Sequence, residues 1–212
     1  MKLYLIRHGE TQWNLQGRLQ GQTDIALNEN GIRLAQITAK HMQKIPLHFA
    51  VTSPLIRARQ TAEILLEGRN IPIYEDARLK EISFGVWEGL GCRKDNYEIP
   101  SEHFNDFYEN PLQFVPGEKG ETVEHLCKRT AEFYEDLISR KNLENQSVLI
   151  ATHGCALRSL LYHIDPKADF WRGHVPINCS VTIIEVKHGA SKIIEEDKIY
   201  YDSNDVVDFY SH

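Results

Sequence analysis

The chain has 212 residues, 42% of them hydrophobic and 25% charged, a composition typical of a globular protein with a substantial core. Its 24 basic and 30 acidic residues give a formal net charge of -6, which argues against nucleic acid as a partner. No stretch approaches the ~20 apolar residues that a membrane span needs, and the opening run is too short for a signal peptide. The four cysteines are scattered without a C-x-x-C pair, which argues against a zinc ribbon or a disulfide framework. We therefore expect a cytoplasmic protein that binds neither membranes nor nucleic acid.

Strand and helix patterns alternate along the chain. Short apolar runs predict strands, and longer segments with apolar residues three and four apart predict helices. In chain order, the expected elements are a strand at 3–6, a helix from Asn28 to about Lys44, a strand at 47–52, a helix from Ser53-Pro54 to about Leu66, a strand at 71–74, a helix from Glu121 to about Lys141, a strand at 147–152, a helix from Gly154 to about His163, and strands at 181–186 and 192–200. Asn28 and Ser53 are expected to cap their helices, and a hairpin turn is expected at 187–190. The alternation predicts an α/β three-layer sandwich with a mostly parallel central sheet and helices on both faces.

The stretch from 76 to 120 has no regular pattern. It holds five glycines, three prolines and the aromatic cluster Phe104, Phe107 and Tyr108. We expect short helices here that form a lid or flank on a single domain of residues 1–212. Simple core packing under a long loop is an equal alternative for the aromatic residues.

Three of the predicted strands run into residues suited to bind a phosphate. The first is followed by Arg7-His8-Gly9, the second by Ser53-Pro54 with Arg57 one helical turn on, and the fourth by His153-Gly154. Ligands of open parallel sheets bind beyond the carboxyl ends of the strands, so these side chains are expected at one edge. Taken singly, each could be a core histidine or a solvated arginine. Together, two histidines and two arginines predict a pocket for a dianion, with phosphate the obvious candidate.

Four sequence blocks resemble the signature of the histidine phosphatase (phosphoglycerate mutase-like) superfamily, in its order and at its spacing, over most of residues 1–165. They are Leu5-Ile6-Arg7-His8-Gly9-Glu10-Thr11 with Trp13-Asn14 and Gly17-Arg18-Leu19-Gln20-Gly21, then Ser53-Pro54-Leu55-Ile56-Arg57-Ala58-Arg59-Gln60-Thr61-Ala62, then Leu79-Lys80-Glu81-Ile82-Ser83-Phe84-Gly85-Val86-Trp87-Glu88-Gly89, and Ala151-Thr152-His153-Gly154. The F-G-x-W-E-G form of the third block is similar to that of the broad-specificity and α-ribazole phosphatase-like members.

The resemblance implies a phosphomonoester hydrolase that acts on a small phosphorylated metabolite without a metal or another cofactor. His8 would attack the phosphorus through an unprotonated ring nitrogen and form a phosphohistidine, which water then hydrolyses. Arg7, Arg57 and His153 would bind the phosphoryl oxygens, with Asn14 as a neutral donor. These roles suit phosphoryl transfer, which requires mainly that the reacting groups be positioned and that the charge on the transferred group be stabilised.

The leaving alkoxide needs a proton, and Glu81 matches the family's general acid. By chemistry alone Glu10 or Glu88 could serve instead, and any of the three could be a surface carboxylate. The resemblance also implies that Gln20 and Gly21 face the substrate, together with the segment that carries the aromatic cluster.

Alternatives lie inside and outside the family. A cofactor-dependent phosphoglycerate mutase carries Arg and Tyr after the acid glutamate, whereas Ile82, Ser83 and Phe84 follow here, so hydrolysis is favoured. An inactive phosphate-binding relative is disfavoured because the expected catalytic residues are all present. Cys155 as a nucleophile would need an arginine six residues later, where Leu161 stands. The sequence makes no prediction of oligomeric state.

Overall fold

The computed structural model describes residues 1–205, so the expected domain of residues 1–212 extends past the described part at 206–212. Its strands and α-helices are β1 (Lys2–Arg7), α1 (Gln12–Leu15), α2 (Glu29–Met42), β2 (Phe49–Thr52), α3 (Ile56–Leu65), β3 (Ile73–Glu75), α4 (Asp106–Glu109), α5 (Val123–Ile138), β4 (Ser147–Thr152), α6 (Gly154–Ile164), β5 (Val181–Lys187) and β6 (Ala190–Lys198). Short 3₁₀ turns lie at Ala77–Leu79, Gly85–Trp87, Pro111–Gln113, Lys141–Leu143 and Ser203–Asp205. No helix within residues 1–205 combines the length and apolar character needed to cross a membrane.

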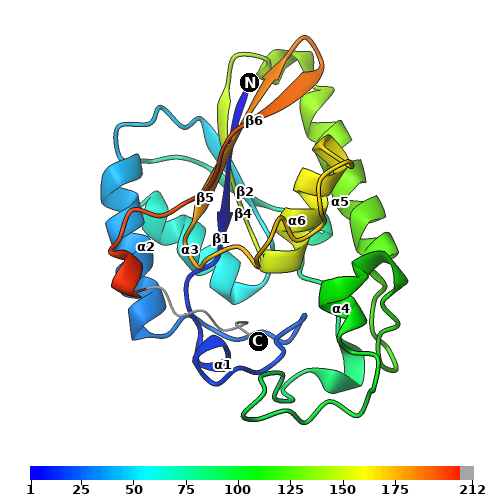
Figure 1. Cartoon of the computed structure of the whole chain (residues 1–212). Helices are drawn as coiled ribbons and strands as arrows, with labels where there is room; N and C mark the ends of the chain where they lie inside the picture. Colours follow the sequence, from blue (N-terminus) through cyan, green and yellow to red (C-terminus); the bar gives the residue numbers. More distant parts are fainter. Residues whose placement is uncertain (206–212) are drawn as a thin grey trace.

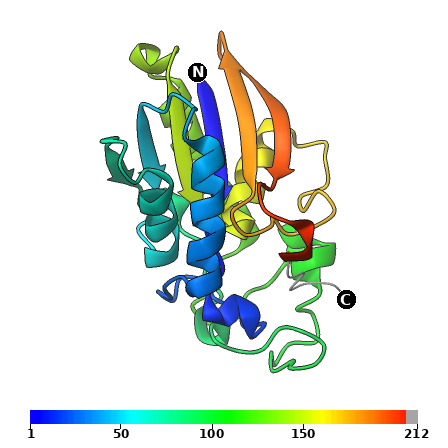
Figure 2. The ribbon, with the colours of Figure 1, turned by 90° about the vertical axis from the view of Figure 1, so that its left-hand side faces the viewer.

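The six strands form one sheet in the order β3-β2-β4-β1-β5-β6. The pairs β1–β4, β2–β4 and β2–β3 are parallel, whereas β5 runs antiparallel to β1 and β6 antiparallel to β5. Helices α2 and α3 cover one face of the sheet and α5 and α6 cover the other (Figures 1 and 2). The predicted α/β three-layer sandwich with a mostly parallel sheet is therefore confirmed.

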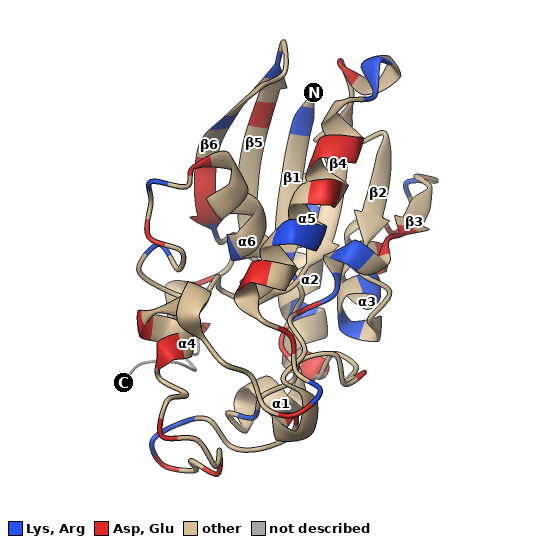
Figure 3. Ribbon diagram, turned by 90° about the vertical axis from the view of Figure 1, so that its right-hand side faces the viewer, with Lys and Arg blue, Asp and Glu red and all other residues tan. Residues whose placement is uncertain are grey.

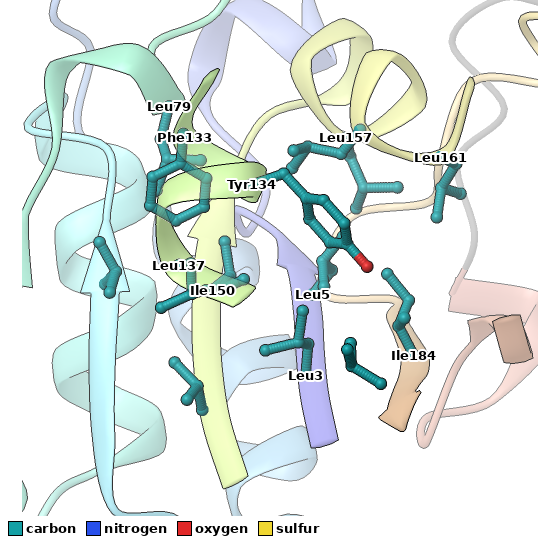
Figure 4. Close-up of a cluster of buried hydrophobic side chains, with 14 of the residues drawn as sticks. Leu3, Leu5, Leu79, Phe133, Tyr134, Leu137, Ile150, Leu157, Leu161 and Ile184 are labelled. Atoms are coloured by element: carbon teal, nitrogen blue, oxygen red, sulfur yellow. The ribbon is translucent and has the colours of Figure 1, made fainter. Parts of the chain in front are cut away.

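Both faces of the central strands are buried, as expected for parallel strands between two helical layers. Successive side chains of a strand point to opposite faces. Leu3 and Leu5 accordingly pack toward α5 and α6 (Figure 4), whereas Tyr4 and Ile6 pack in the cluster built with α2 and α3. The two hydrophobic clusters hold β1 and β4 firmly, and the carboxyl ends of these strands are fixed with them.

Several predicted boundaries differ from the structure for local reasons. Asn28 caps α2 as predicted, since its side chain accepts the Gly31 N–H at 2.7 Å. The prediction that Ser53 caps α3 is wrong, because Leu55 is the N-cap residue and makes no side-chain cap. Strand β3 starts at Ile73, two residues after the predicted start at residue 71, because Pro72 has no N–H to donate to a neighbouring strand. The predicted hairpin is present between β5 and β6.

The segment from 76 to 120 consists of 3₁₀ turns, the four-residue helix α4 and loops beside the carboxyl ends of β1 and β4 (Figure 1). A third hydrophobic cluster lies under it. Phe104, which is 1% exposed, packs its ring against those of Phe84, Phe107 and Phe114 there. Phe104 therefore packs in a core under the loop, which is the alternative that the sequence offered for the aromatic residues.

Candidate active site

The predicted residues meet at the carboxyl edge of the sheet. Arg7 ends β1 and His8 follows it, His153 is the N-cap residue of α6 directly after β4, and Arg57 lies in the first turn of α3. A pocket opens there. Its lining residues are Arg7, His8, Leu19, Gln20, Gly21, Arg57, Glu81, Phe84, Phe107, Tyr108, Gly154, Cys155, Trp171 and Val175.

His8 is held as a neutral imidazole. Its Nδ1 lies 2.7 Å from the carbonyl oxygen of Gly9, which only accepts hydrogen bonds, so Nδ1 carries the proton and Nε2 is an unprotonated acceptor. The Nε–H of Arg57 points at this nitrogen from 3.3 Å. Burial, followed by the positive charges of Arg57 and Arg7, holds the pKa of His8 well below its usual value. An unprotonated nitrogen therefore lies at the pocket.

Glycine is required after His8 by close packing. A Cβ atom added at Gly9 would lie 2.7 Å from the backbone oxygen of Gly31, closer than side chains approach backbone. The Gly9 N–H donates to Thr61 Oγ1 of α3 at 3.0 Å. The loop after β1 is therefore pressed between α2 and α3, which fixes His8.

Backbone carbonyl oxygens, not carboxylates, anchor the two buried guanidinium groups. Arg57 donates through Nη2 to Gly21 O at 2.7 Å and through Nη1 to Thr23 O at 2.9 Å. Arg7 donates through Nη1 to Pro176 O. Burial lowers the pKa of Arg57 to about 10, which leaves it charged at neutral pH. Their positive charge therefore remains available to an anion.

His153 lies against His8, with ring centroids 5.1 Å apart. Its Nε2 is 2.8 Å from Ser53 Oγ, which accepts the Leu55 N–H. The Ser53 hydroxyl proton is thus free to donate to Nε2, and the ring proton of His153 then resides on Nδ1. Burial, then Arg57 and His8, hold the pKa of His153 well below its usual value. Ser53, predicted as a helix cap, orients this histidine instead.

Three buried nitrogen atoms here have no hydrogen-bond partner within residues 1–205: Arg7 Nε, Asn14 Nδ2 and His153 Nδ1. Asn14 is held through its oxygen by Thr11, whose hydroxyl also bonds Gln20 at 3.0 Å. Buried polar groups are nearly always paired, and an unpaired one costs about 1–3 kcal/mol. Each of the three belongs to a residue that the sequence predicted to bind phosphate. Of the three, only Arg7 is among the described residues that line the pocket, whereas Asn14 and His153 are buried and outside that lining.

Glu81 lies at the N-terminus of α6. Its Oε2 accepts the Cys155 N–H at 3.1 Å and its Oε1 accepts the Ala156 N–H at 3.0 Å. A Cβ atom added at Gly154 would lie 3.7 Å from Glu81 Oε2 and 3.8 Å from Arg7 Nε, so both side chains border this glycine. Helix α6 thus places a carboxyl group beside Arg7 at the pocket.

The two competing carboxylates have other partners. Glu10 accepts the Asn28 amide at 2.7 Å at the start of α2. Glu88 accepts backbone N–H groups from Gln22 and Thr23. Neither lines the pocket, whereas Glu81 does.

The outer wall of the pocket is aromatic and apolar. Phe107 and Tyr108 from the predicted cluster line it, together with Trp171 and Val175, which sequence reasoning missed. The indole Nε1–H of Trp171 donates to the carbonyl oxygen of Phe107 at 2.8 Å. The pair Phe170-Trp171 in a stretch without strand or helix pattern was the available signal, because such residues rarely stay exposed.

Cys155 lies in the pocket wall and is 2% exposed. Burial, and then the nearby Glu81, raise the pKa of its thiol well above the usual value. A nucleophilic thiolate is therefore not favoured at this position.

A family model for the histidine phosphatase superfamily (branch 1) matches residues 3–196. The chain belongs to the histidine phosphatase superfamily. Among relatives within it, the uncharacterized phosphatase PhoE of Bacillus subtilis is 37% identical over 160 residues, covering 76% of this chain and 75% of the relative. Other relatives carry the name 2,3-bisphosphoglycerate-dependent phosphoglycerate mutase.

Solved structures of histidine phosphatases share the fold. YhfR of Bacillus stearothermophilus superposes with a TM-score of 0.83 at 36% identity, covering 93% of this chain and 97% of that one. A phosphoserine phosphatase mutant from Entamoeba histolytica, solved with phosphoserine, gives a TM-score of 0.78 at 27% identity, covering 92% and 96%. A phosphatase solved with phosphoserine thus shares this architecture.

Proposed function

We propose that this histidine phosphatase hydrolyses small phosphomonoesters through a phosphohistidine on His8, without a metal ion. The observation that carries the proposal is the unprotonated Nε2 of His8 beside the guanidinium groups of Arg7 and Arg57, with unpaired nitrogen atoms on Arg7, Asn14 and His153. A phosphoryl group that accepts from Arg7, Asn14 and His153 presents its phosphorus to His8 Nε2. Fixed donors of this kind stabilise the charge on the equatorial oxygens, as Mg²⁺ does elsewhere.

Glu81 is proposed as the general acid. Its carboxyl group lines the pocket and borders Arg7. Protonation of the leaving alkoxide contributes typically ~10²–10⁴-fold to the rate. The same carboxylate then activates the water that hydrolyses the phosphohistidine.

The wall of the pocket favours hydrolysis over mutase chemistry. Arg7 and Arg57 are the only Lys or Arg residues among those that line the pocket within residues 1–205. Both are used on the phosphoryl group, so a second phosphate or a carboxylate finds no further Lys or Arg among the described residues that line the pocket. We therefore propose substrates whose alcohol part is small and carries no second anionic group.

Neither nucleic acid nor membrane is proposed as a partner. Lys and Arg residues alternate with Asp and Glu on α5 (Figure 3), and the formal net charge is -6. The cytoplasmic location stays a prediction of the sequence.

The test is phosphate release from a panel of phosphomonoesters in EDTA. We expect wild-type protein and His41→Ala, a surface histidine control, to release phosphate, and His8→Ala to release none. A phosphoprotein labile to acid and stable to alkali should accumulate in wild type and in His41→Ala, and not in His8→Ala. Loss of activity in EDTA would contradict the metal-independent mechanism, and isomerisation of 3-phosphoglycerate with 2,3-bisphosphoglycerate would favour the mutase alternative.

A further inference from the structure

The carboxylate of Glu88 joins two loops beside the active site. Oε1 accepts the N–H groups of Gln22 at 3.0 Å and Phe84 at 3.1 Å, and Oε2 accepts the N–H of Thr23 at 2.8 Å. The hydroxyl groups of Thr23 and Ser83 donate to it as well. One side chain thus fixes residues 22–23 against residues 83–84.

The loop that Glu88 holds is the one that orients Arg57. The two Nη atoms of Arg57 donate to Gly21 O and Thr23 O, on either side of Gln22. With both ends held, the Nε–H of Arg57 points at Nε2 of His8. The direction of this guanidinium group therefore depends on two carbonyl oxygens of the loop. Besides Glu88, the Gln22 amide, which donates to Glu81 O at 3.1 Å, and Asp24, which accepts the Ile56 N–H at 2.7 Å, hold this loop.

Gly21 shows how closely the loop lies against the carboxylate. Its φ of +54° is in the left-handed region, and an added Cβ atom would lie 2.2 Å from Glu88 Oε1. The loop cannot shift toward Glu88 without a clash, and it cannot move away without losing its N–H bonds.

We infer that Glu88 is a positioning residue, which aims Arg57 at the phosphoryl group and His8 by fixing the carbonyl oxygens of Gly21 and Thr23. The inference rests on the proposed function of the same site. It assigns Glu88 a role distinct from that of Glu81, although both are carboxylates of one sequence block. Glu88 transfers no proton, since its two oxygens already accept five donors and Glu88 is not among the described residues that line the pocket.

The leaving group separates these two roles. An acid matters most for a poor leaving group such as the alkoxide of benzyl phosphate and little for the phenolate of 4-nitrophenyl phosphate. A misplaced Arg57 impairs both esters alike, because it acts on the transferred group. A shift of about 1 Å in a positioned group can cost ~10²-fold in rate.

We expect Glu88→Gln, which turns an amide N–H toward backbone N–H donors, to lower kcat/KM about 10²-fold for both esters. Its affinity for inorganic phosphate, measured by calorimetry, should fall as well. Glu81→Gln should instead lose far more on benzyl phosphate than on 4-nitrophenyl phosphate and keep its affinity for phosphate. Glu98→Gln, which alters a carboxylate that accepts the Gly91 N–H at 2.8 Å on another loop, should behave as wild type.

A loss in Glu88→Gln that is confined to benzyl phosphate would overturn the inference, and so would unchanged rates and phosphate affinity. If Glu88→Gln fails to fold, Thr23→Val, which keeps the backbone N–H and removes one donor to Glu88, should show a smaller loss on both esters. If wild type hydrolyses neither ester, the proposed function fails, while phosphate affinity of the Glu88 variant still decides the positioning role.

Discussion

A shift from pH 7.5 to 5.5 is expected to destabilise the folded protein through His8 and His153. Burial, and then neighbouring guanidinium groups, hold the pKa of both imidazoles well below the usual value. In the unfolded chain the same groups titrate at ~6.5. Below that pH the unfolded chain binds protons that the folded protein does not, so stability is present at neutral pH and is lost as the pH falls.

The size of this loss in stability follows from the titration of histidine in the unfolded chain. An imidazole that stays neutral in the folded protein lowers the free energy of unfolding by about 1.4 kcal/mol between pH 7.5 and 5.5. The two histidines together lower it by about 2.7 kcal/mol, a large share of the ~5–15 kcal/mol that holds a domain folded.

Urea unfolding at the two pH values, in buffer without phosphate, measures this loss. The contributions of other titrating groups to the pH dependence of the free energy of unfolding cancel when variants are compared. The difference between the two pH values should shrink by about 1.4 kcal/mol in His8→Gln and again in His153→Gln, and it should stay at the wild-type value in His41→Gln. If the two active-site variants lose as much stability as wild type, the histidines are not held neutral and the reasoning is refuted.

Two further predictions concern packing. Ile150→Ala, in the fully buried centre of β4, should lower the free energy of unfolding by ~2–5 kcal/mol, whereas Ile194→Ala, 50% exposed on β6, should change it by no more than ~0.5 kcal/mol; equal effects in urea unfolding would contradict the assigned layers. Trp171→Phe leaves the carbonyl of Phe107 without its N–H donor, at a cost of ~1–3 kcal/mol. It should also raise KM for aryl phosphates, and an unchanged KM would show that this wall does not contact the substrate.

Local sequence patterns predicted most of the fold. Strands β1, β2 and β4 are largely apolar runs, and Asn28 caps α2 as its position indicates, so element types and order were predictable. Helix α1 (Gln12–Leu15) was missed because four residues are too few for a periodic pattern. The start of α3 was misplaced because Ser53 has a tertiary partner, His153, that no local rule contains.

In the candidate site, the residues at strand ends could be predicted from the sequence, whereas those on loops could not. Arg7, His8 and His153 directly follow or end predicted strands, which determines the sheet edge that they reach. Trp171 and Val175 come from a stretch whose path depends on contacts far away in the sequence. Such contacts include the bond from Arg158 of α6 to the carbonyl oxygen of His174 at 2.9 Å.

The hydrogen bond from Trp171 to the carbonyl of Phe107 connects two segments that lie 64 residues apart, and neither belongs to the sheet. An insertion or deletion in one segment displaces the other. A substitution at Trp171 that changes the pocket wall therefore also removes a hydrogen bond to residue 107, so the shape of this wall is a joint property of the two loops.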